Sequence, residues 1–350
     1  MPELPEVETV RRGLERLVVG RRIVGVDALN PGSLDAPVPL DGVAVIAARR
    51  RAKMLILDLD DGRSLAVHLK MTGQLIIRHP EWATRQPEGL SVAGGVPGGD
   101  AFGILPPPCT PGPSYTGAPS DRGGDTPEPP LVENHPPDES PVGVESDWGG
   151  GHPSDSLIGD LPDRSTRVVF DLDDGGRLFF NDQRKFGWIR AVPRDVAEAW
   201  ASVYGPEPMD DDAWPRFRAL ARRHQKAPVK AVLLDQQVVA GIGNIYADEA
   251  LWGARVHPAS RVGALSDRAL HRVLDEAADV MEISIELGGS TARNYVDAEG
   301  RRGAYLDFAR VFHREGLPCP RCGTIIVKTR VAGRGTHLCP RCQRVRRLAP

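Results

Sequence analysis

The hydrophobic pattern changes its period along the chain. Near the start, apolar residues recur three and four positions apart at Val7, Val10, Leu14 and Leu17. Because such residues share one helix face, and because proline suits a first helical turn, the pattern predicts a helix from Pro5. Partly alternating runs rich in β-branched residues follow, and this alternation predicts strands. The runs are residues 22–26, 42–48, 54–59, 64–69 and 73–77.

Residues 80–163 interrupt the sheet pattern. The segment holds 17 of the 32 prolines and has no sustained periodicity. Since it cannot bury enough apolar surface to offset the entropy of ordering, we expect a disordered insertion. Strand signals resume at residues 167–172 and 177–180. The insertion should therefore lie between two strands of one domain, as an expanded hairpin loop.

From about Pro193 the apolar spacing becomes helical. The expected helices are residues 195–204, 211–224, 229–237, 244–252 and 266–287. Strands followed by helices predict an α+β protein with more than one domain.

Charge is segregated along the 350 residues. The net charge is −3, but residues 80–163 hold 14 of the 47 acidic residues and two of the 44 basic ones. The remainder carries 42 basic residues against 33 acidic ones, and such a basic body suits phosphate binding. The chain has no apolar run of membrane-spanning length and no secretory signal, so we expect a cytoplasmic protein.

Four of the five cysteines form two close pairs, Cys319 with Cys322 and Cys339 with Cys342. Four thiolates at this spacing fit one tetrahedral zinc ion held by two knuckles. No open ligand position would remain, which indicates a structural role for the zinc. Thiol pairs without metal would leave little to hold so small a tail together. Cys109, in the insertion, is expected to be a free surface thiol.

Pro2 would become the chain terminus if Met1 were removed. Its secondary amine, with a pKa near the usual α-amino value of roughly 7.7–8.0, could attack an aldehyde-like carbon and form an imine. Glu3 and Glu6 lie beside it as candidate proton donors and acceptors. Taken alone, these residues are better explained by a routine N-terminus with a helix cap.

Further motifs favour the catalytic interpretation of Pro2. In their order along the chain, they closely resemble those of the bacterial formamidopyrimidine-DNA glycosylases, over residues 1–78 and 165–345. The motifs are Met1–Thr9, Arg51-Ala-Lys53, His68-Leu-Lys-Met71-Thr-Gly73, Asn181-Asp-Gln-Arg184-Lys-Phe186-Gly187, Gly205-Pro-Glu-Pro, Leu234-Asp-Gln-Gln, Gly241-Ile-Gly-Asn244-Ile-Tyr-Ala-Asp-Glu249, Gly288-Gly-Ser-Thr and the four cysteines with Arg334.

The resemblance implies a fold. We expect an N-terminal β-sandwich domain with an N-terminal helix over residues 1–192, which contains the insertion. A helix–two-turn–helix DNA-binding domain should follow over residues 193–305, and a zinc finger hairpin over residues 306–345. The partner implied is double-stranded DNA with oxidised bases or abasic sites, bound by a monomer without a membrane.

The resemblance also implies the catalytic residues. Pro2 would be the Schiff-base nucleophile, and Glu3 would protonate the opening deoxyribose. Lys53 would contact the lesion phosphate and assist elimination; without the motif it would be a solvated strand lysine. Arg334 would grip the phosphates that flank the lesion.

Other residues would bind the DNA around the lesion. Met71, Arg184 and Phe186 would fill the space left by a flipped base, where an apolar wedge and a guanidinium offset lost stacking. For Met71 and Phe186 the alternative is core packing. Residues 288–305 resemble a lid over the flipped base. Candidate phosphate contacts are Asn244, Lys226 and Lys230.

The chain departs from the family pattern at residues 163–166, where a DNA-contacting histidine is usual. Arg164 or Arg167 could replace that contact. The activity implied is excision of 8-oxoguanine opposite cytosine and of formamidopyrimidines, followed by β,δ-elimination of the abasic strand. One rival is an endonuclease VIII-like enzyme for oxidised pyrimidines, against which Leu4 and the Arg184–Phe186 pair speak. The other is a non-catalytic DNA-binding paralogue. For the acidic insertion, competition with DNA and a tolerated solvated loop are both open.

Overall fold

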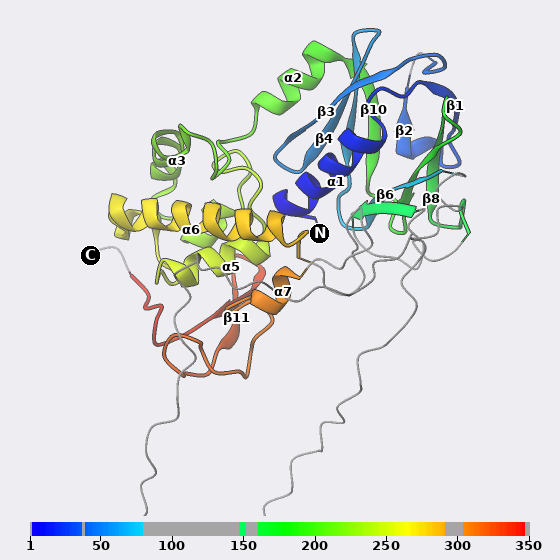
Figure 1. Cartoon of the computed structure of the whole chain (residues 1–350). Coiled ribbons are helices and arrows are strands. Elements are labelled where there is room, and N and C mark those ends of the chain that lie inside the picture. The colour runs from blue at the N-terminus through cyan, green and yellow to red at the C-terminus, as the bar shows by residue number, and fades with distance from the viewer. Residues whose placement is uncertain (1, 37–38, 80–146, 152–159, 291–303, 347–350) are drawn as a thin grey trace, which may run out of the picture. The chain divides into compact units, whose positions relative to one another are not determined.

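The computed structural model describes residues 2–36, 39–79, 160–290 and 304–346, together with the backbone of residues 147–151 (Figure 1). The expectations for Cys109, for most of the insertion and for residues 291–303 of the lid lie outside the described residues. No helix in the described part of the chain is long and apolar enough to cross a membrane.

The N-terminal part contains helix α1 (Leu4–Leu17) and two five-stranded sheets. Buried apolar residues of α1 and of both sheets form one cluster, so the sheets pack face to face as the expected β-sandwich. One sheet has the order β1 (Ile23–Asp27), β8 (Thr166–Leu172), β9 (Arg177–Asp182), β6 (Gly73–Arg78), β7 (Asp147–Gly151). The other has the order β2 (Leu34–Asp35), β10 (Trp188–Pro193), β5 (Arg63–His68), β4 (Met54–Leu59), β3 (Val45–Arg51).

The predicted disorder of residues 80–163 is wrong at residues 147–151. This segment forms β7, which pairs antiparallel with β6 along residues 74–78. Its glycines add no side chains, and pairing satisfies backbone groups that the edge of β6 would otherwise leave open. The strands expected to flank the insertion, β6 and β8, are not paired, because β9 lies between them; the hairpin is instead formed by β6 and β7, which pair antiparallel and are connected by residues 79–146. Strands β2 and β10 were not predicted.

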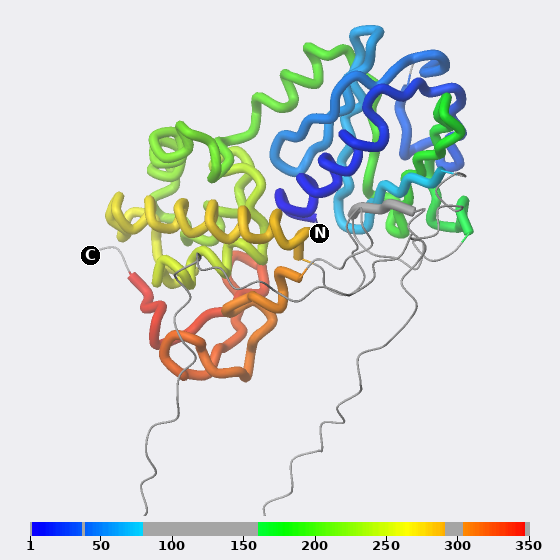
Figure 2. Tube along the Cα trace, viewed as in Figure 1, coloured from blue at the N-terminus to red at the C-terminus, as the bar shows by residue number. Residues whose placement is uncertain are grey.

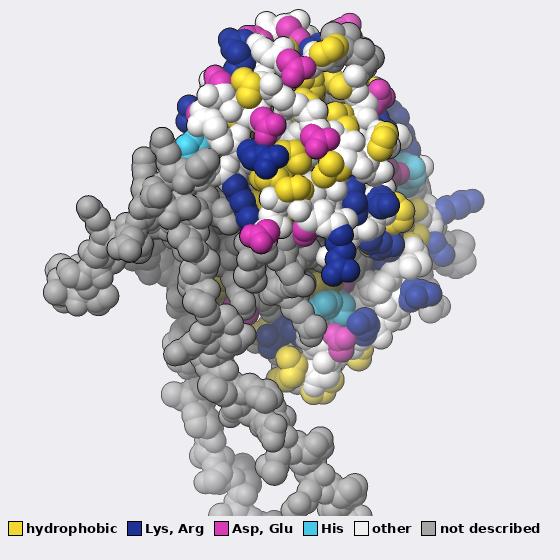
Figure 3. Space-filling view, turned by 90° about the vertical axis from the view of Figure 1, so that its right-hand side faces the viewer, with side chains coloured by type: hydrophobic (Ala, Val, Ile, Leu, Met, Phe, Trp, Pro, Cys, Tyr) yellow, Lys and Arg dark blue, Asp and Glu magenta, His cyan; other side chains and the backbone are white. Residues whose placement is uncertain are grey.

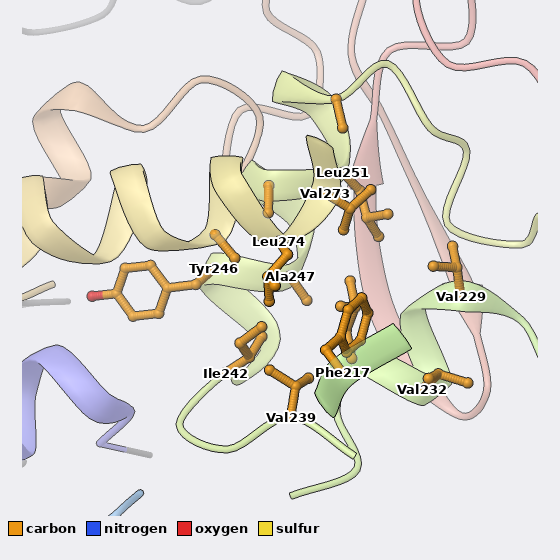
Figure 4. Packing of buried hydrophobic residues seen from close by; sticks show 14 of the residues in the cluster. Phe217, Val229, Val232, Val239, Ile242, Tyr246, Ala247, Leu251, Val273 and Leu274 are labelled. Carbon is orange, nitrogen blue, oxygen red and sulfur yellow. The ribbon is translucent and has the colours of Figure 1, made fainter. Parts of the chain in front are cut away.

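The second part is helical. The elements are α2 (Arg194–Ser202), α3 (Ala213–Ala221), α4 (Val229–Leu233), α5 (Asn244–Gly253) and α6 (Asp267–Glu286), with short 3-10 turns at Arg222–His224 and Val262–Ala264. A further 3-10 turn, Pro31–Ser33, precedes β2 in the N-terminal part. Helix α4 is shorter than the expected helix over residues 229–237. Phe217, Val232, Val239 and Ile242 pack together in the core, and the hydroxyl of Tyr246 points out of this cluster (Figure 4).

The C-terminal part consists of the short helix α7 (Tyr305–Phe308) and the hairpin of β11 (Val327–Val331) and β12 (Arg334–Leu338). A two-residue turn at Ala332 and Gly333 joins the strands, and both residues have positive φ. This combination is typical of a tight turn that matches strand twist. Arg334 follows this turn directly, as the first residue of β12.

Candidate active site

The N-terminal peptide is attached to both parts of the chain. Glu3 is the N-cap of α1, where it forms a capping box with Glu6, and its backbone N–H donates to Glu6 Oε2 at 2.8 Å. The carboxylate of Glu3 also accepts a hydrogen bond of 3.1 Å from the backbone N–H of Ile245, in the first turn of α5. Figures 1 and 2 show the start of α1 close to α6. The side chain next to Pro2 therefore lies at two helix N-termini.

Two glycines before α5 allow this close approach. A Cβ on Gly243 would lie 2.2 Å from Cδ of Glu3, and one on Gly241 would lie 2.4 Å from Cδ1 of Leu4. Gly241 also has a φ of +88°, a conformation that side chains disfavour. The two glycines of the motif Gly241-Ile-Gly243 therefore allow the N-terminal peptide to contact the backbone before α5.

Glu3 and Lys53 form a buried acid–base pair. Burial raises the pKa of Glu3 to about 7, against the opposing effect of the nearby Lys53. Burial likewise lowers the pKa of Lys53, whose Nζ donates to the carbonyl oxygen of Ile242 at 2.9 Å. Because the pKa of Glu3 lies near neutrality, its carboxyl group can exchange protons at physiological pH, so it suits general acid–base chemistry.

The turn that carries Lys53 is fixed by the helical part. Ala52, with a φ of +55°, and Lys53 connect β3 to β4. The carboxylate of Glu207 accepts a hydrogen bond of 2.7 Å from the backbone N–H of Ala52. It also receives two bonds of 2.8 Å from the guanidinium of Arg50. This bidentate pair gives the Gly205-Pro-Glu-Pro motif a structural role.

Met71, Arg184 and Phe186 come together at the surface. They lie in two different loops, between β5 and β6 and between β9 and β10. Arg184 Nη1 approaches Met71 Sδ at 3.1 Å, and its guanidinium lies 4.9 Å from the ring centroid of Phe186. Met71 is 40% exposed and Phe186 53% exposed, which excludes core packing for both. Two exposed apolar side chains around a cation can enter a base stack.

A buried carboxylate holds these two loops in place. Asp182 is fully buried, and its oxygens accept bonds from the backbone N–H groups of Arg184 at 3.1 Å and Gly187 at 2.6 Å. The hydroxyl of Thr72 also donates to it. Asp182 therefore connects the loop of Met71 to the loop of Arg184. Sequence reasoning quoted this residue within a motif but assigned it no role.

Asn244 and Arg334 border the buried pair from two other elements. Asn244 is the half-buried first residue of α5, and its Oδ1 has no protein partner in the described structure. Arg334 is close enough to Lys53 and Lys230 to lower the pKa of both lysines, after the larger effect of burial. The hairpin tip thus places a second cation beside Lys53.

The phosphate contact expected of Lys230 is not supported. Lys230 is fully buried, and its ammonium donates to Asp248 at 2.6 Å and to Gly335 and Thr336 at 2.9 Å each. All three donors are therefore used to join α4, α5 and the zinc finger hairpin. Lys226 is exposed, as a phosphate contact requires.

The contact expected of Arg167 is not supported either. Its guanidinium is buried and donates to the carbonyl oxygens of Asp182 at 2.7 Å and Arg164 at 3.0 Å. Arg164 is exposed and is the better replacement for the histidine of the family pattern.

The structure adds three residues that the sequence did not single out in these roles. Glu6 Oε1 accepts bonds of 2.7 Å from the Tyr246 hydroxyl and from the N–H and hydroxyl of Ser290. Glu6 therefore anchors the start of the expected lid. Burial, with Lys70 and Lys53 nearby, lowers the pKa of His68 to about 3, so this histidine is neutral. Tyr305 is buried, and the centroid of its ring lies 5.4 Å from the centroid of the Tyr246 ring.

The four cysteines converge as expected. The sulfur atoms of Cys319, Cys322, Cys339 and Cys342 lie within 4.8 Å of one another. The indole N–H of Trp252 donates to the Cys319 sulfur at 3.4 Å, which favours its thiolate. Four converging thiolates fit one structural zinc ion, which would crosslink the two knuckles.

Lys and Arg side chains gather across the middle of the face shown in Figure 3, below a mixed surface of apolar and charged residues. Such a band suits a polyanionic partner.

Three family models match the chain. The formamidopyrimidine-DNA glycosylase N-terminal domain matches residues 1–92, and the H2TH domain of the same glycosylases matches residues 204–296. A zinc finger found in FPG and IleRS matches residues 316–345.

Relatives match over nearly the whole length. A formamidopyrimidine-DNA glycosylase of Chloroflexus aurantiacus is 35% identical, with 98% of each chain covered. One of Streptococcus pyogenes is 32% identical, with 99% of this chain and all of the relative covered. Among solved structures, Lactococcus lactis Fpg in complex with an abasic site containing DNA has a TM-score of 0.69 at 28% identity. That alignment covers 98% of this chain and 99% of the other.

Proposed function

The chain belongs to the formamidopyrimidine-DNA glycosylase family of base-excision repair enzymes, which are also abasic-site lyases, and from this we propose that Pro2 is its nucleophile. The observation that supports this role is the buried pair of Glu3 and Lys53 next to Pro2. The pKa of Glu3, raised to about 7, makes it a proton donor near neutral pH, and the lowered pKa of Lys53 makes this lysine a better base than an exposed one.

The reaction begins when the neutral Pro2 amine attacks C1′ of the damaged nucleotide. The N-glycosidic bond breaks, and the base leaves with its electron pair and takes up a proton. Glu3 protonates the ring oxygen as the deoxyribose opens, and the nitrogen of Pro2 becomes part of an imine. The imine withdraws electrons, so a base removes a C2′ proton and the 3′ phosphate leaves in β-elimination. A second elimination releases the 5′ phosphate, and water frees Pro2.

The substrates that we propose are 8-oxoguanine opposite cytosine and formamidopyrimidines. Arg184 would face the orphaned cytosine, while Met71 and Phe186 fill the gap in the stack. Asn244, Lys226 and Arg334 would hold phosphates on either side. The zinc ion maintains the hairpin that carries Arg334 and takes no part in the chemistry.

The test is borohydride trapping on duplexes that carry 8-oxoguanine or an oxidised pyrimidine, with removal of Met1 verified by mass. We expect a covalent adduct with the 8-oxoguanine duplex and none with Pro2→Gly. Pro31→Gly, at the start of a 3-10 turn, is the matched control and should trap normally. Absence of an adduct from the mature protein would refute the role of Pro2. Preferential trapping on the pyrimidine lesion would instead support an endonuclease VIII-like specificity.

We further propose that the protein acts as a monomer on the bacterial chromosome. Bacterial relatives over the full length support this setting.

A further inference from the structure

The C-terminal segment is more basic than the proposed reaction requires. Residues 316–350 contain eight Lys and Arg residues and no Asp or Glu, and the reaction uses only Arg334. Five arginines in and next to this segment gather on one side of the zinc finger. We name them the C-terminal arginine surface: Arg255, Arg321, Arg341, Arg344 and Arg346.

The backbone under this surface is fixed. Arg321 and Arg341 occupy the same position in the two Cys-Pro-Arg-Cys knuckles. The segment after the last cysteine lies along residues 256–261. Gln343 Nε2 donates to the carbonyl oxygen of Val256 at 3.0 Å, and the backbone N–H of Arg346 donates to Ser260 Oγ at 2.9 Å. The arginines therefore extend from the two knuckles, from the residues just after α5 and from a segment that is hydrogen-bonded to residues 256–260.

Two adjoining hollows of about 550 and 510 Å³ open between these side chains. Arg255 and Arg341 line both of them. The first hollow is completed by Arg321, Cys322 and Cys342, and the second by Cys342 and residues 344–346. A concave surface lined by several guanidinium groups concentrates positive potential.

The surface has more positive charge than the zinc site can neutralise. Four thiolates and Zn²⁺ carry a net charge of −2. Arg321 stacks on Trp252 at 3.8 Å and donates to its carbonyl oxygen, so it has a structural task. Arg255, Arg341, Arg344 and Arg346 are exposed, and none has an ion pair with a carboxylate in the described structure. Four unneutralised guanidinium groups exceed what the thiolates need.

The surface is also separate from the lesion site. Helix α5 begins at Asn244, beside Glu3, and ends at Gly253, just before Arg255. Ten residues at a rise of about 1.5 Å place these ends roughly 15 Å apart. The hairpin repeats this separation, because Arg334 is at its tip while Leu338 pairs with Val327 at the knuckle end. Lys53 and Arg334 are therefore near one end of α5 and of the hairpin, and the arginines are near the other end.

We propose that the C-terminal arginine surface binds the phosphates of a second segment of duplex DNA. Arginine forks match phosphate oxygens in pairs, and the surface has no exposed aromatic platform for unstacked bases. This inference rests on the proposed function only in that DNA is the polyanion the enzyme meets. A second contact would let the protein hold one segment while it tests another.

The test counts duplexes bound. A short undamaged duplex of about 12 base pairs is titrated against the protein, and the stoichiometry and salt dependence are measured. We expect two duplexes per wild-type protein and one for the triple variant R255Q/R341Q/R344Q. The control R12Q/R177Q/R216Q removes the same charge from α1, β9 and α3 and should keep two. In the triple variant R255Q/R341Q/R344Q, the affinity for the second duplex should fall by about tenfold or more. The salt slope of that second binding step should fall by about 2.

Single-turnover cleavage of the same short duplex with a lesion reports the proposed function separately, and the triple variant should cleave normally. Zinc content and thermal unfolding check folding; if the triple variant loses zinc, R344Q/R346Q replaces it. One duplex per wild-type protein, or two per variant, would overturn the proposal. So would binding of an acidic peptide at this surface without binding of the duplex.

Discussion

Glu3 and Ile245 are 242 residues apart in the chain, yet the backbone N–H of Ile245 donates to Glu3 Oε1 at 3.1 Å. One carboxylate thereby joins the N-termini of α1 and α5. Both helix ends favour its ionised form, which partly offsets the cost of burial. The position of Pro2 therefore depends on where α5 begins.

The first prediction concerns Gly243→Ala. Because the new Cβ would lie 2.2 Å from Glu3, the carboxylate must move away from Pro2 and Lys53. We expect a loss of about 100-fold or more in single-turnover excision, equivalent to about 2.7 kcal/mol of barrier. Gly32→Ala is the control, because a Cβ there meets no atom within 4 Å. Equal activities for the two variants would contradict the role of this close approach.

The raised pKa of Glu3 predicts a pH-dependent stability. The folded-state pKa of about 7 exceeds the unfolded value of 4.5, so the folded protein binds the proton more tightly. The stability contributed by the protonated acid is complete below the unfolded pKa and is lost as pH rises through about 7. Relative to Glu3→Gln, the wild type should lose on the order of 2–3 kcal/mol between about pH 5 and pH 8.

Chemical unfolding at several pH values measures this difference, and Glu282→Gln, on the exposed face of α6, controls for loss of a carboxylate. A constant difference between wild type and Glu3→Gln across this range would show that Glu3 ionises normally.

Asp182→Asn should make the loops that carry Met71, Arg184 and Phe186 less well fixed, while the catalytic residues stay unchanged. The amide of Asn has one oxygen acceptor and an NH2 donor, so the N–H of Gly187 or of Arg184 loses its partner at a cost of about 1–3 kcal/mol. We expect affinity for abasic-site DNA to fall by about tenfold more than affinity for undamaged DNA. Thr72→Ser, the control, keeps the hydroxyl that donates to Asp182 and should therefore discriminate as well as the wild type. Equal losses on both duplexes would mean that Asp182 serves only stability.

Lys230 and Lys226 should respond in opposite ways. Lys230→Met leaves Asp248 buried without its cation, which should cost about 3–5 kcal/mol of unfolding free energy. Lys226→Gln should change stability by less than about 0.5 kcal/mol and lower the salt slope of DNA binding by about 0.9. Denaturant unfolding and binding at several salt concentrations separate the two. A stable Lys230→Met protein with a reduced salt slope of DNA binding would support the phosphate contact that the sequence predicted for Lys230.

Local pattern was sufficient for most elements. Helical spacing predicted α1, α5 and α6, because each has an apolar face or is buried against the core. Strand β10 was not predicted, because it directly follows the motif Asn181–Gly187, whose residues were interpreted only as DNA contacts. Strand β7 was missed because Asp147–Gly151 is rich in glycine and pairs by backbone alone. Pairing with a distant edge leaves no hydrophobic signature in the sequence.

Site residues were predictable where a motif carried them, but their surroundings were not. The two lysines Lys226 and Lys230 look alike in sequence, and only the fold reveals that Asp248 approaches one of them. Glu6 was read as a proton carrier because nothing local indicates that Tyr246 and Ser290 will converge on it. Long-range polar contacts of this kind are set by tertiary packing.

Helix α5 has a consequence for the modularity of the chain. Its successive carboxylates, Asp248 and Glu249, are fully buried and accept backbone N–H groups of His337 and of residues 310–312. The sequence can be divided into three family segments, but the polar interior of the last segment is supplied by the middle one. Because these donors are backbone N–H groups, a chimera with another zinc finger keeps the bonds if the new backbone follows the same path. A chain cut before residue 310 would instead leave both acids of α5 buried without these donors, so the middle segment should not fold stably without the last one.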